Sequence, residues 1–545
     1  MTIELPEAFI RKMKSLLKDE FQDFYSSYND PRHYGVRINT LKVAAQQFAT
    51  ISPFALERVP WCPTGFYYPE GERPGKHPYY HAGLYYIQEP SAMLPVELLE
   101  IRPGDRVLDL CAAPGGKTTQ IAAKLQGTGL VVANDNQAER VKALVKNVEM
   151  AGIRNAIVLN ELPEKMITHF ADYFDKILID APCSGEGMFR KEPEMAAQWE
   201  KHSVERCSAL QKDILESAAM MLTEGGRIVY STCTFSPEEN EAMIVSFLKR
   251  HPEFRLVPVQ AEGCSAGRAD WSGPTSWKND DGREGSGIPG PAPLPGTVRL
   301  WPHLVRGEGH FAAVLEKAHA AHAASADEAE ERDVQASVYI RSADEHTLSV
   351  SHAGQIKVNA AAGRLARKAA GPGKRGHKEA EAGRSRRDKN GKGKPKETFM
   401  AATAAWEAFI KEHLTVHPPG ELVVYGDRLY LTPAYPPALD GLKVSRPGWY
   451  VGTIRHNRFI PSHALAMGLK AEEAVRRVNL SSQSMEAVNY LRGDTLPVAE
   501  VDILRAGQCP AKGWCLVCID GYAAGWGKWQ DGILKNEYPP GWRMT

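Results

Sequence analysis

Two cysteines stand in short polar turns that follow apolar runs typical of buried strands. Cys183 lies in Asp180-Ala-Pro-Cys-Ser-Gly-Glu-Gly-Met188, and Cys233 lies in Tyr230-Ser-Thr-Cys-Thr-Phe-Ser-Pro237. A single cysteine is more often an inert core residue than a reactive one. If the two runs are adjacent parallel strands, their carboxyl ends face one crevice, and both thiols can approach the same substrate atom.

This pair of thiols suits the covalent activation of a pyrimidine ring. Carbon 5 of cytosine is a poor nucleophile until a thiolate adds to carbon 6 and turns the ring into an enamine. A free thiol has a pKa of about 8.5, so the attacking cysteine needs surroundings that favour its thiolate. Asp180 is expected to hold the ring nitrogen and amino edge and to stabilise the charge that forms there. After methyl transfer the carbon 5 proton must leave and the thiol must be eliminated, which gives a second cysteine a task. The residues alone do not say which cysteine attacks.

A glycine turn earlier in the chain predicts a ligand site at the same edge. The segment Arg106–Thr118 contains an apolar run, Asp109, Gly115 and Gly116, and then the start of a helix. Glycines let the backbone approach a ligand closely, and a helix N-terminus offers free N–H groups to a carboxylate. The spacing matches neither the dinucleotide motif GxGxxG nor the phosphate loop GxxxxGKT. Asp135 ends the next apolar run, where it can accept hydrogen bonds from ribose hydroxyls or simply cap a helix.

The elements that must position these residues follow the pattern of an α/β protein. Short apolar runs alternate with helical stretches, which is typical of a parallel sheet covered on both faces. We predict strands at 106–111, 130–135, 156–160, 176–181, 227–232 and 310–316. The segment 263–295 is rich in Gly, Ser, Pro and charge and is expected to be an exposed loop before the last strand.

Length and composition favour several domains. A chain of 545 residues exceeds one hydrophobic core. We divide it into an N-terminal α+β unit (1–95), a catalytic α/β domain (96–317), a flexible linker (318–398) with a short ordered patch near 335–358, and a β-rich C-terminal unit (399–545). The formal net charge is zero, but fourteen Lys and Arg face four acidic residues between 357 and 397. That segment is expected to attract a polyanion such as a nucleic-acid backbone.

The cysteine count and the absence of obvious targeting signals indicate a reduced, cytoplasmic protein. Nine cysteines are scattered without the spacing of a disulfide framework. Cys515 and Cys518 form a lone Cys-x-x-Cys, which we interpret as two core residues and not as a metal site. No secretory signal or membrane-spanning stretch is visible.

Together the motifs resemble those of the Sun/Fmu-type RNA cytosine-5 methyltransferases, in particular their RsmF branch. The most specific segments are 109–118, 180–185 and 231–234. The resemblance implies a Rossmann-like class I methyltransferase sheet, S-adenosylmethionine as cofactor, Cys233 as the nucleophile and Cys183 as the residue that assists product release. The cofactor contacts it implies are Ala112, Ala113, Pro114, Gly115, Gly116, Lys117, Asp135, Arg140 and Asp180. Asn160 is our candidate for the adenine contact, with Glu161 as the alternative.

The same resemblance identifies candidate RNA contacts at both ends of the chain. The C-terminal unit resembles the PUA-like tail of the branch, where aromatic residues beside cations suit base stacking and phosphate contact. An ordinary β-barrel core would also be aromatic. The candidate RNA contacts are Arg37, Asn39, Lys42, Lys528, Lys535 and Arg543.

The implied partner is 16S ribosomal RNA or the 30S particle, bound by a monomer that contacts neither DNA nor membrane. A tRNA methyltransferase and a non-catalytic ribosome-assembly factor are the alternatives. Intact Cys183, Cys233 and Asp180 argue against the second. A DNA cytosine methyltransferase is disfavoured, because its usual thiol follows a Pro-Cys pair and only one of the two cysteines here does so.

Overall fold

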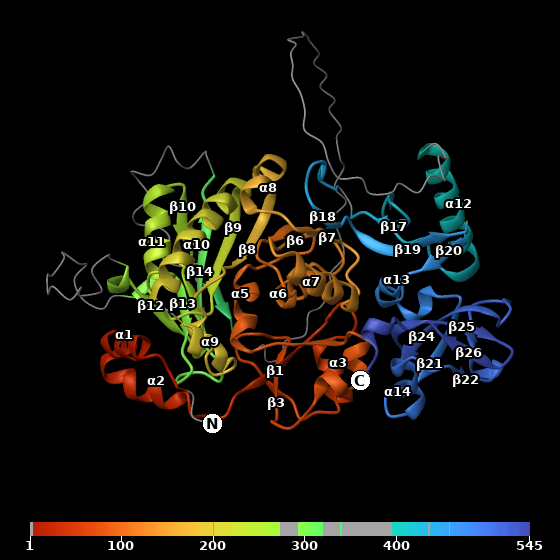
Figure 1. Ribbon diagram of the computed structural model, residues 1–545, viewed down its shortest axis with the longest axis horizontal. Helices are drawn as coiled ribbons and strands as arrows, with labels where there is room; N and C mark the ends of the chain where they lie inside the picture. Colours follow the sequence, from red (N-terminus) through yellow and green to blue (C-terminus); the bar gives the residue numbers. More distant parts are fainter. Residues whose placement is uncertain are drawn as a thin grey trace, which may run out of the picture.

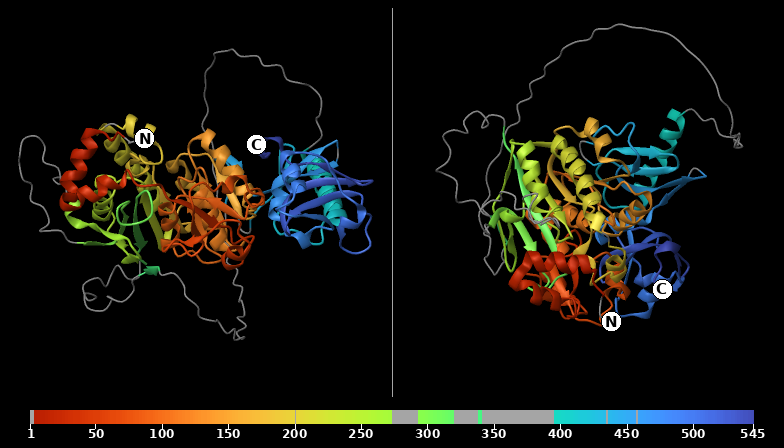
Figure 2. Two further views of the ribbon diagram at one scale, coloured as in Figure 1. Left: turned by 90° about the horizontal axis from the view of Figure 1, so that it is seen from below. Right: turned by 60° about the vertical axis from the view of Figure 1, so that its left-hand side comes forward.

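The computed structural model describes residues 4–199, 201–272, 293–319, 338–340, 395–433, 436–456 and 458–545. A large sheet occupies the middle of the molecule, and two smaller β-sheets from the C-terminal part lie at one end (Figures 1 and 2). None of the helices in the described part of the chain has the length and apolar character that crossing a bilayer requires.

The large sheet is built around five parallel strands. Their spatial order is β9-β8-β5-β6-β7, so the chain reverses direction across the sheet at β5 and β8. The order confirms the predicted doubly wound α/β architecture, whose ligand crevice lies at such a reversal. The strands are β5 (Arg106–Asp109), β6 (Leu130–Asn134), β7 (Ala156–Leu159), β8 (Phe174–Asp180) and β9 (Leu222–Thr232).

Helices cover both faces of this sheet, because strands that are buried on both sides carry apolar residues in both directions. Leu108 and Ile177 face one helical layer, and Val107 and Leu178 face the other. The layer on the Val107 side contains α5 (Leu94–Leu98), α6 (Gly116–Leu125) and α7 (Ala138–Met150). The opposite layer contains α8 (Pro163–Phe170), α10 (Lys201–Met221) and α11 (Glu241–Arg250), and the short α9 (Pro193–Gln198) precedes α10.

Antiparallel strands extend the sheet beyond β9 and correct one prediction. The segment 263–295 was expected to be a loop, but Ser265–Arg268 forms β12, which pairs with β13 (Pro293–Leu300). β12 lies at the edge of the sheet and is held by backbone hydrogen bonds to β13. The polar composition of the segment does not indicate this pairing. Residues 273–292 lie outside the described residues. The other strands of this extension are β14 (His310–Lys317) and β10 (Phe254–Leu256). A separate parallel pair consists of β11 (Val259–Ala261) and β15 (Val338–Ile340).

The N-terminal residues divide between two cores. The helices α1 (Glu7–Leu17) and α2 (Phe21–Ser27) pack against Phe189, Phe235 and Trp301 of the catalytic part. The small antiparallel sheet shares a core with the C-terminal part instead. Its elements are β1 (Tyr34–Ile38), α3 (Ala45–Ile51), β2 (Glu57–Arg58), β3 (Gly65–Tyr68), α4 (Pro78–His81) and β4 (Tyr85–Ile87), in the strand order β2-β3-β1-β4.

The C-terminal part carries two sheets and begins with a helix, α12 (Pro395–His413). Most of the expected linker 318–398 lies outside the described residues. The first sheet contains β16 (Leu422–Tyr425), β17 (Arg428–Leu431), β19 (Trp449–Arg455) and β20 (Arg458–Pro461), followed by α13 (His463–Gly468). The second contains β21 (Arg476–Leu480), α14 (Met485–Arg492), β22 (Leu496–Pro497), β23 (Leu504–Arg505), β24 (Gly513–Ile519), β25 (Tyr522–Gln530) and β26 (Ile533–Asn536). Cys515 and Cys518 are buried in β24.

One strand of the C-terminal part joins the catalytic sheet. β18 (Val444–Arg446) pairs antiparallel with β7, so that Val444 lies opposite Leu159. The two parts are therefore connected by backbone hydrogen bonds as well as by side-chain packing. Arg446, which is 1% exposed, anchors the strand by donating to the carbonyl of Gly448.

Candidate functional site

The two candidate cysteines lie at the ends of neighbouring parallel strands. Cys183 follows β8 and Cys233 follows β9, with Asp180 opposite Ser231 in the register. The Ala181 N–H donates to the Ser231 carbonyl at 2.8 Å, which continues the strand pairing into both turns. The two sulfur atoms are 3.3 Å apart. This is the hydrogen-bond distance expected for a thiol and a thiol or thiolate, so both can meet one substrate atom.

The surroundings of Cys183 favour its protonated form. The hydrogen bond to Cys233 raises the pKa of Cys183 well above its ordinary value, and burial raises it further. Cys183 therefore keeps its proton at neutral pH and can donate it to the sulfur of Cys233. Either sulfur can be the donor in the hydrogen bond between them. The order of the two roles therefore still rests on the family resemblance.

Asp180 is held as a carboxylate beside the thiols. Lys117 Nζ lies 2.7 Å from one of its oxygens, and the Ser231 hydroxyl donates to the other at 3.0 Å. Burial alone would raise the pKa of Asp180, but Lys117 and His310 outweigh burial and hold it well below its usual range. His310 Nε2 is 3.7 Å from the carboxylate. An ionised Asp180 can accept hydrogen bonds from a substrate but cannot donate one.

The glycine turn between β5 and α6 has the shape that the sequence predicted. Gly115 has a φ of 111°, which residues with a side chain rarely adopt, and α6 begins at the next residue. A Cβ on Gly116 would lie 3.0 Å from the ring of Tyr86. Asp109 is fully buried, and burial raises its pKa to about 7. One of its oxygens accepts from Thr118, whereas the other has no hydrogen-bond partner among the described residues.

Asp135 and Arg140 brace this turn from the end of β6. The Ala113 N–H donates to Asp135 at 3.3 Å, and Arg140 donates to the Ala113 carbonyl at 2.5 Å. Arg140 and Asp135 also form an ion pair at 3.2 Å. Asn147 donates to the Pro114 carbonyl at 2.7 Å. The structure thus brings the predicted cofactor residues Ala112–Lys117, Asp135, Arg140 and Asp180 to one edge of the sheet.

The two candidates for an adenine contact differ in availability. Glu161 is 2% exposed, and its carboxylate accepts the backbone N–H groups of Leu162 at 3.1 Å and Lys443 at 3.3 Å. Asn160 is half-buried, and its side-chain NH2 group donates to the Asp135 carbonyl at 2.8 Å. Its side-chain oxygen takes no part in that hydrogen bond. Asn160 is the more accessible of the two. Its N–H donates to the Lys443 carbonyl, so the C-terminal part fixes this corner.

The N-terminal RNA candidates do not lie on the surface. Arg37 is 3% exposed and donates to Gln88 and, at 2.6 Å, to Thr119. Asn39 is 8% exposed and donates to the carbonyls of Gly83 at 2.8 Å and Ala151 at 2.9 Å. Both side chains join the N-terminal sheet to the catalytic part. The expectation that they contact RNA is therefore not carried further, because their polar groups are buried and occupied.

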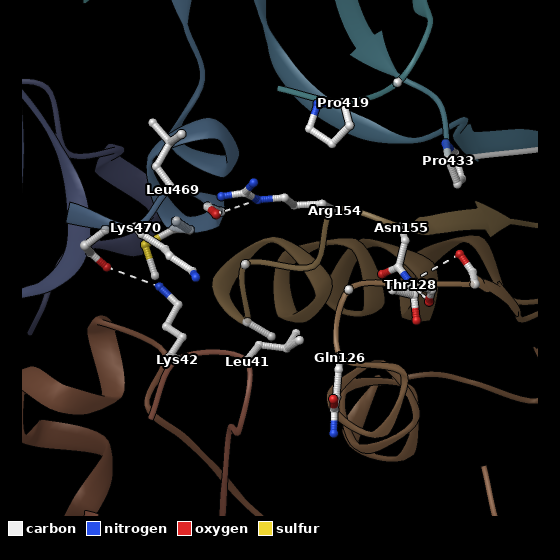
Figure 3. A pocket seen from close by; sticks show the side chains of 18 of the residues that line it. Leu41, Lys42, Gln126, Thr128, Arg154, Asn155, Pro419, Pro433, Leu469 and Lys470 are labelled. Carbon is white, nitrogen blue, oxygen red and sulfur yellow. Dashed lines mark hydrogen bonds between the residues drawn. The ribbon is translucent and has the colours of Figure 1, made fainter. Parts of the chain in front are cut away.

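Lys42 borders a large cavity at the junction of the N-terminal, catalytic and C-terminal parts. The cavity has a volume of about 1040 Å³ and is also lined by Arg154 and Lys470 (Figure 3). Lys42 donates to the Ala523 carbonyl at 3.2 Å, and burial lowers its pKa to about 7. The lining includes neither thiol and none of the predicted cofactor residues. The cavity is thus separate from the turns that contain the two cysteines.

The C-terminal candidates are exposed on the second C-terminal sheet. Lys528 and Lys535 lie opposite each other on β25 and β26, and the Lys528 ammonium is 4.1 Å from the centre of the Trp514 ring. Arg543 is also exposed. Lys528 also lies 3.8 Å from the carboxylate of Glu537, which offsets part of the repulsion between the two lysines.

Several residues of the site escaped the sequence analysis. His310 and Tyr86 contact it from other elements, and Glu186 and Glu239 are buried behind the cysteine turns. Glu186 stands inside the motif that contains Cys183, which was a signal. His310 begins a predicted strand, but nothing in the pattern placed that strand beside β9.

Comparisons with known proteins match four parts of the chain. The models concerned describe the N-terminal domain of 16S rRNA methyltransferase RsmF at residues 5–90, 16S rRNA methyltransferase RsmB/F at 96–316, the RsmF rRNA methyltransferase first C-terminal domain at 408–469 and the methyltransferase RsmF PUA domain at 477–544.

Similar proteins of known name include ribosomal RNA small subunit methyltransferase F of Erwinia tasmaniensis, which is 35% identical over 57% of this chain and 63% of its own. The protein of the same name from Vibrio vulnificus is 42% identical over 44% of this chain and 53% of its own. The chain thus spans less than two thirds of the length of either relative. A solved methyltransferase homolog from Pyrococcus horikoshii is 28% identical, covers 58% of this chain and 96% of its own, and has a TM-score of 0.49.

Proposed function

We propose that this chain methylates carbon 5 of a cytosine in 16S rRNA. The chain belongs to the RsmB/F family of 16S rRNA methyltransferases, because family domains match it in order from residue 5 to residue 544. The observation that carries the proposal is the pair of sulfur atoms 3.3 Å apart beside an ionised Asp180. Cys233 is the nucleophile and Cys183 its hydrogen-bond donor.

Cys233 acts first, as a thiolate that adds to carbon 6 of the ring. The new carbon–sulfur bond pushes the electrons of the 5,6 double bond toward carbon 5 and the ring nitrogen. Asp180, being ionised, accepts a hydrogen bond from the amino group of the cytosine and orients that edge. We assign stabilisation of the negative charge to the Lys117 ammonium, because a carboxylate cannot stabilise it; this revises the role expected of Asp180.

The cofactor we infer is S-adenosylmethionine, and the residues at the glycine turn fit it. The unpartnered oxygen of Asp109 and the N-terminus of α6 offer an acceptor and N–H donors at one place. The backbone of Ala112–Lys117, together with Asp135, Arg140, Asn160 and Asp180, would hold it. When bound, it supplies an electrophilic methyl group.

Cys183 acts in the release of the product. Once carbon 5 carries the methyl group, a solvent water molecule takes its proton, and the electrons of that C–H bond form the 5,6 double bond. The bond between carbon 6 and sulfur breaks in the same step, and Cys233 departs as a thiolate with the electrons of that bond. The hydrogen bond from protonated Cys183 stabilises this leaving group. This account agrees with the roles that the family resemblance implies.

The RNA contacts we propose lie on the C-terminal part. The exposed Lys528 and Lys535 and the half-buried Trp514 form a row across three strands, which suits base stacking and phosphate contact. Arg543 is a further candidate. Most of the basic segment 357–397 lies outside the described residues, and we propose that it adds sequence-independent attraction to RNA. Deleting it should reduce the salt slope of RNA binding; an unchanged slope contradicts this role.

Bisulfite sequencing of total RNA tests the proposed function. Cells that lack the protein should lose one or more protected cytosines in 16S rRNA, and the wild-type chain should restore them whereas Cys233→Ala should not. A lost cytosine in tRNA would show the alternative substrate. If no cytosine changes in any RNA, the chain is a non-catalytic RNA-binding factor and the proposal is wrong.

A further inference from the structure

Two glutamates are completely buried behind the cysteine turns, and the proposed mechanism does not use them. Glu186 follows Cys183 in the chain, and Glu239 follows Cys233. Both side chains belong to residues that are 0% exposed. Burying a carboxylate is costly unless its hydrogen-bonding capacity is filled, so each group needs an account of its partners.

Glu239, from the Cys233 side, holds the turn that contains Cys183. It accepts the backbone N–H of Ser184 at 3.0 Å and forms a short hydrogen bond with the Ser184 hydroxyl. Gln211 donates both to Glu239 and to the carbonyl of Pro182, each at 2.9 Å. The residues on either side of Cys183 are thus fixed by a carboxylate from the other turn.

Glu186, from the Cys183 side, holds the turn that contains Cys233. It accepts the Thr234 hydroxyl at 2.9 Å, the Phe235 N–H at 3.0 Å and the Ser236 hydroxyl at 2.6 Å. The Ser184 and Thr234 hydroxyls lie 2.7 Å apart and join the two sets. Each turn therefore supplies the glutamate that binds the other.

These contacts form a chain of three hydrogen bonds that runs Glu239, Ser184, Thr234, Glu186. Three such bonds need three hydrogen atoms, and the two hydroxyls supply only two. The third must be a carboxylic acid proton. Lys12 donates to the Ser236 hydroxyl at 2.6 Å, which favours the negative charge on Glu186 and leaves the proton on Glu239.

We propose that Glu186, Glu239, Ser184 and Thr234 form a glutamate clasp that holds Cys183 and Cys233 at sulfur contact and that shares one acidic proton. The two glutamates are positioning residues, since neither touches the reacting atoms. The clasp serves the reaction proposed above, but its geometry can be measured without RNA or cofactor. The two proposals can therefore fail independently.

The clasp should weaken at alkaline pH. Burial, and then the charge of Glu186, raise the pKa of Glu239 to about 7. The other titratable groups that face Glu239 are Cys183, Cys207 and Tyr230. A carboxyl whose pKa is raised on folding loses its stabilising contribution as pH rises through that pKa. Above about pH 7 the row of three hydrogen bonds lacks one hydrogen atom, and the two buried carboxylates repel each other.

Oxidation of the two thiols measures how the clasp positions them. In the full-length chain, diamide takes two electrons and two protons from Cys183 and Cys233 and leaves a disulfide, which mass spectrometry of the linked peptides quantifies. Glu239→Ala and Thr234→Val should each slow this reaction about tenfold, because small misplacements of reacting groups carry large rate costs. Thr234→Val preserves the side-chain volume and decides the matter if Glu239→Ala does not fold.

Glu239→Gln separates positioning from ionisation. Its amide can donate to Ser184 and keeps all three hydrogen bonds at any pH, so its rate should equal that of wild type at about pH 6 and exceed it about threefold at about pH 8.5. Glu194→Gln, at an exposed position, should match wild type throughout. The clasp is overturned if a folded Thr234→Val chain forms the disulfide at the wild-type rate. It is also overturned if the ratio of the Glu239→Gln oxidation rate to the wild-type rate does not change with pH.

Discussion

The cysteine site and the junction between the N-terminal sheet and the catalytic part both carry polar residues that the sequence singled out, yet these residues have different surroundings in the two regions. At the cysteine site, Cys183, Cys233 and Asp180 stand at the ends of parallel strands and face one space. At the junction, Arg37 and Asn39 are buried and bond to their own chain. A parallel sheet fixes which residues converge, whereas the packing of small units decides whether a polar residue is exposed.

Removing the nucleophile is the sharpest way to test the cysteine site. Cys233→Ala should lower turnover at least about a thousandfold, because no other group replaces the covalent step. The measurement is methyl transfer from labelled S-adenosylmethionine to 16S rRNA under saturating conditions. Cofactor binding should persist and shows that the variant is folded. Substantial residual turnover would mean that Cys233 does not attack the ring.

The junction should respond in stability instead of activity. Arg37→Ala leaves Gln88 and Thr119 without their buried partner and should cost about 2–4 kcal/mol of unfolding free energy. Denaturant titration of the full chain measures this cost. RNA affinity of the folded variant should remain close to that of wild type.

Lys528→Ala, on the exposed face of the second C-terminal sheet, should change RNA binding and leave stability nearly unchanged. It removes a cation from the Trp514 row and should weaken RNA binding about threefold to tenfold with little change in stability. Titration of RNA at two salt concentrations measures the effect. If Arg37→Ala weakens RNA binding more than Lys528→Ala while both remain folded, the contrast between the two regions is wrong.

Lys42 provides a test of the junction through the pH dependence of stability. Its pKa is lowered to about 7 in the folded chain, so the unfolded chain binds more protons between about pH 7 and pH 10 and stability should rise with pH across that range. Lys42→Met should remove this rise. Melting temperatures at a series of pH values provide the test, and an identical pH dependence in the variant would show that Lys42 is not the group responsible.

The sequence predicted the parts of the fold that depend on local patterns. Apolar runs located all five parallel strands, and the motif after each strand located Asp135, Cys183 and Cys233 at one edge. It could not predict β18, because a three-residue strand that joins a sheet almost three hundred residues earlier leaves no local signal. The same holds for Arg37, whose burial depends on the arrival of α6 beside it.

The site was predicted less completely than the fold. Residue types indicated a thiol pair, but not the hydrogen bond between the two sulfur atoms, since this depends on the contact of two turns. Asp180 was expected to stabilise charge on the ring, and its ion pair with Lys117 changes that role. The glutamates behind the turns were visible as residues, yet only the folded chain brings each to the other turn.

The most direct test of the central claim is to locate the covalent bond between the chain and its RNA. Cys183→Ala, incubated with 16S rRNA and S-adenosylmethionine, should accumulate a denaturation-resistant complex because release is impaired. Mass spectrometry after nuclease digestion should then find a methylated cytidine attached to Cys233. The account is contradicted if the adduct forms on Cys183 in a Cys233→Ala chain, or if neither single variant forms an adduct.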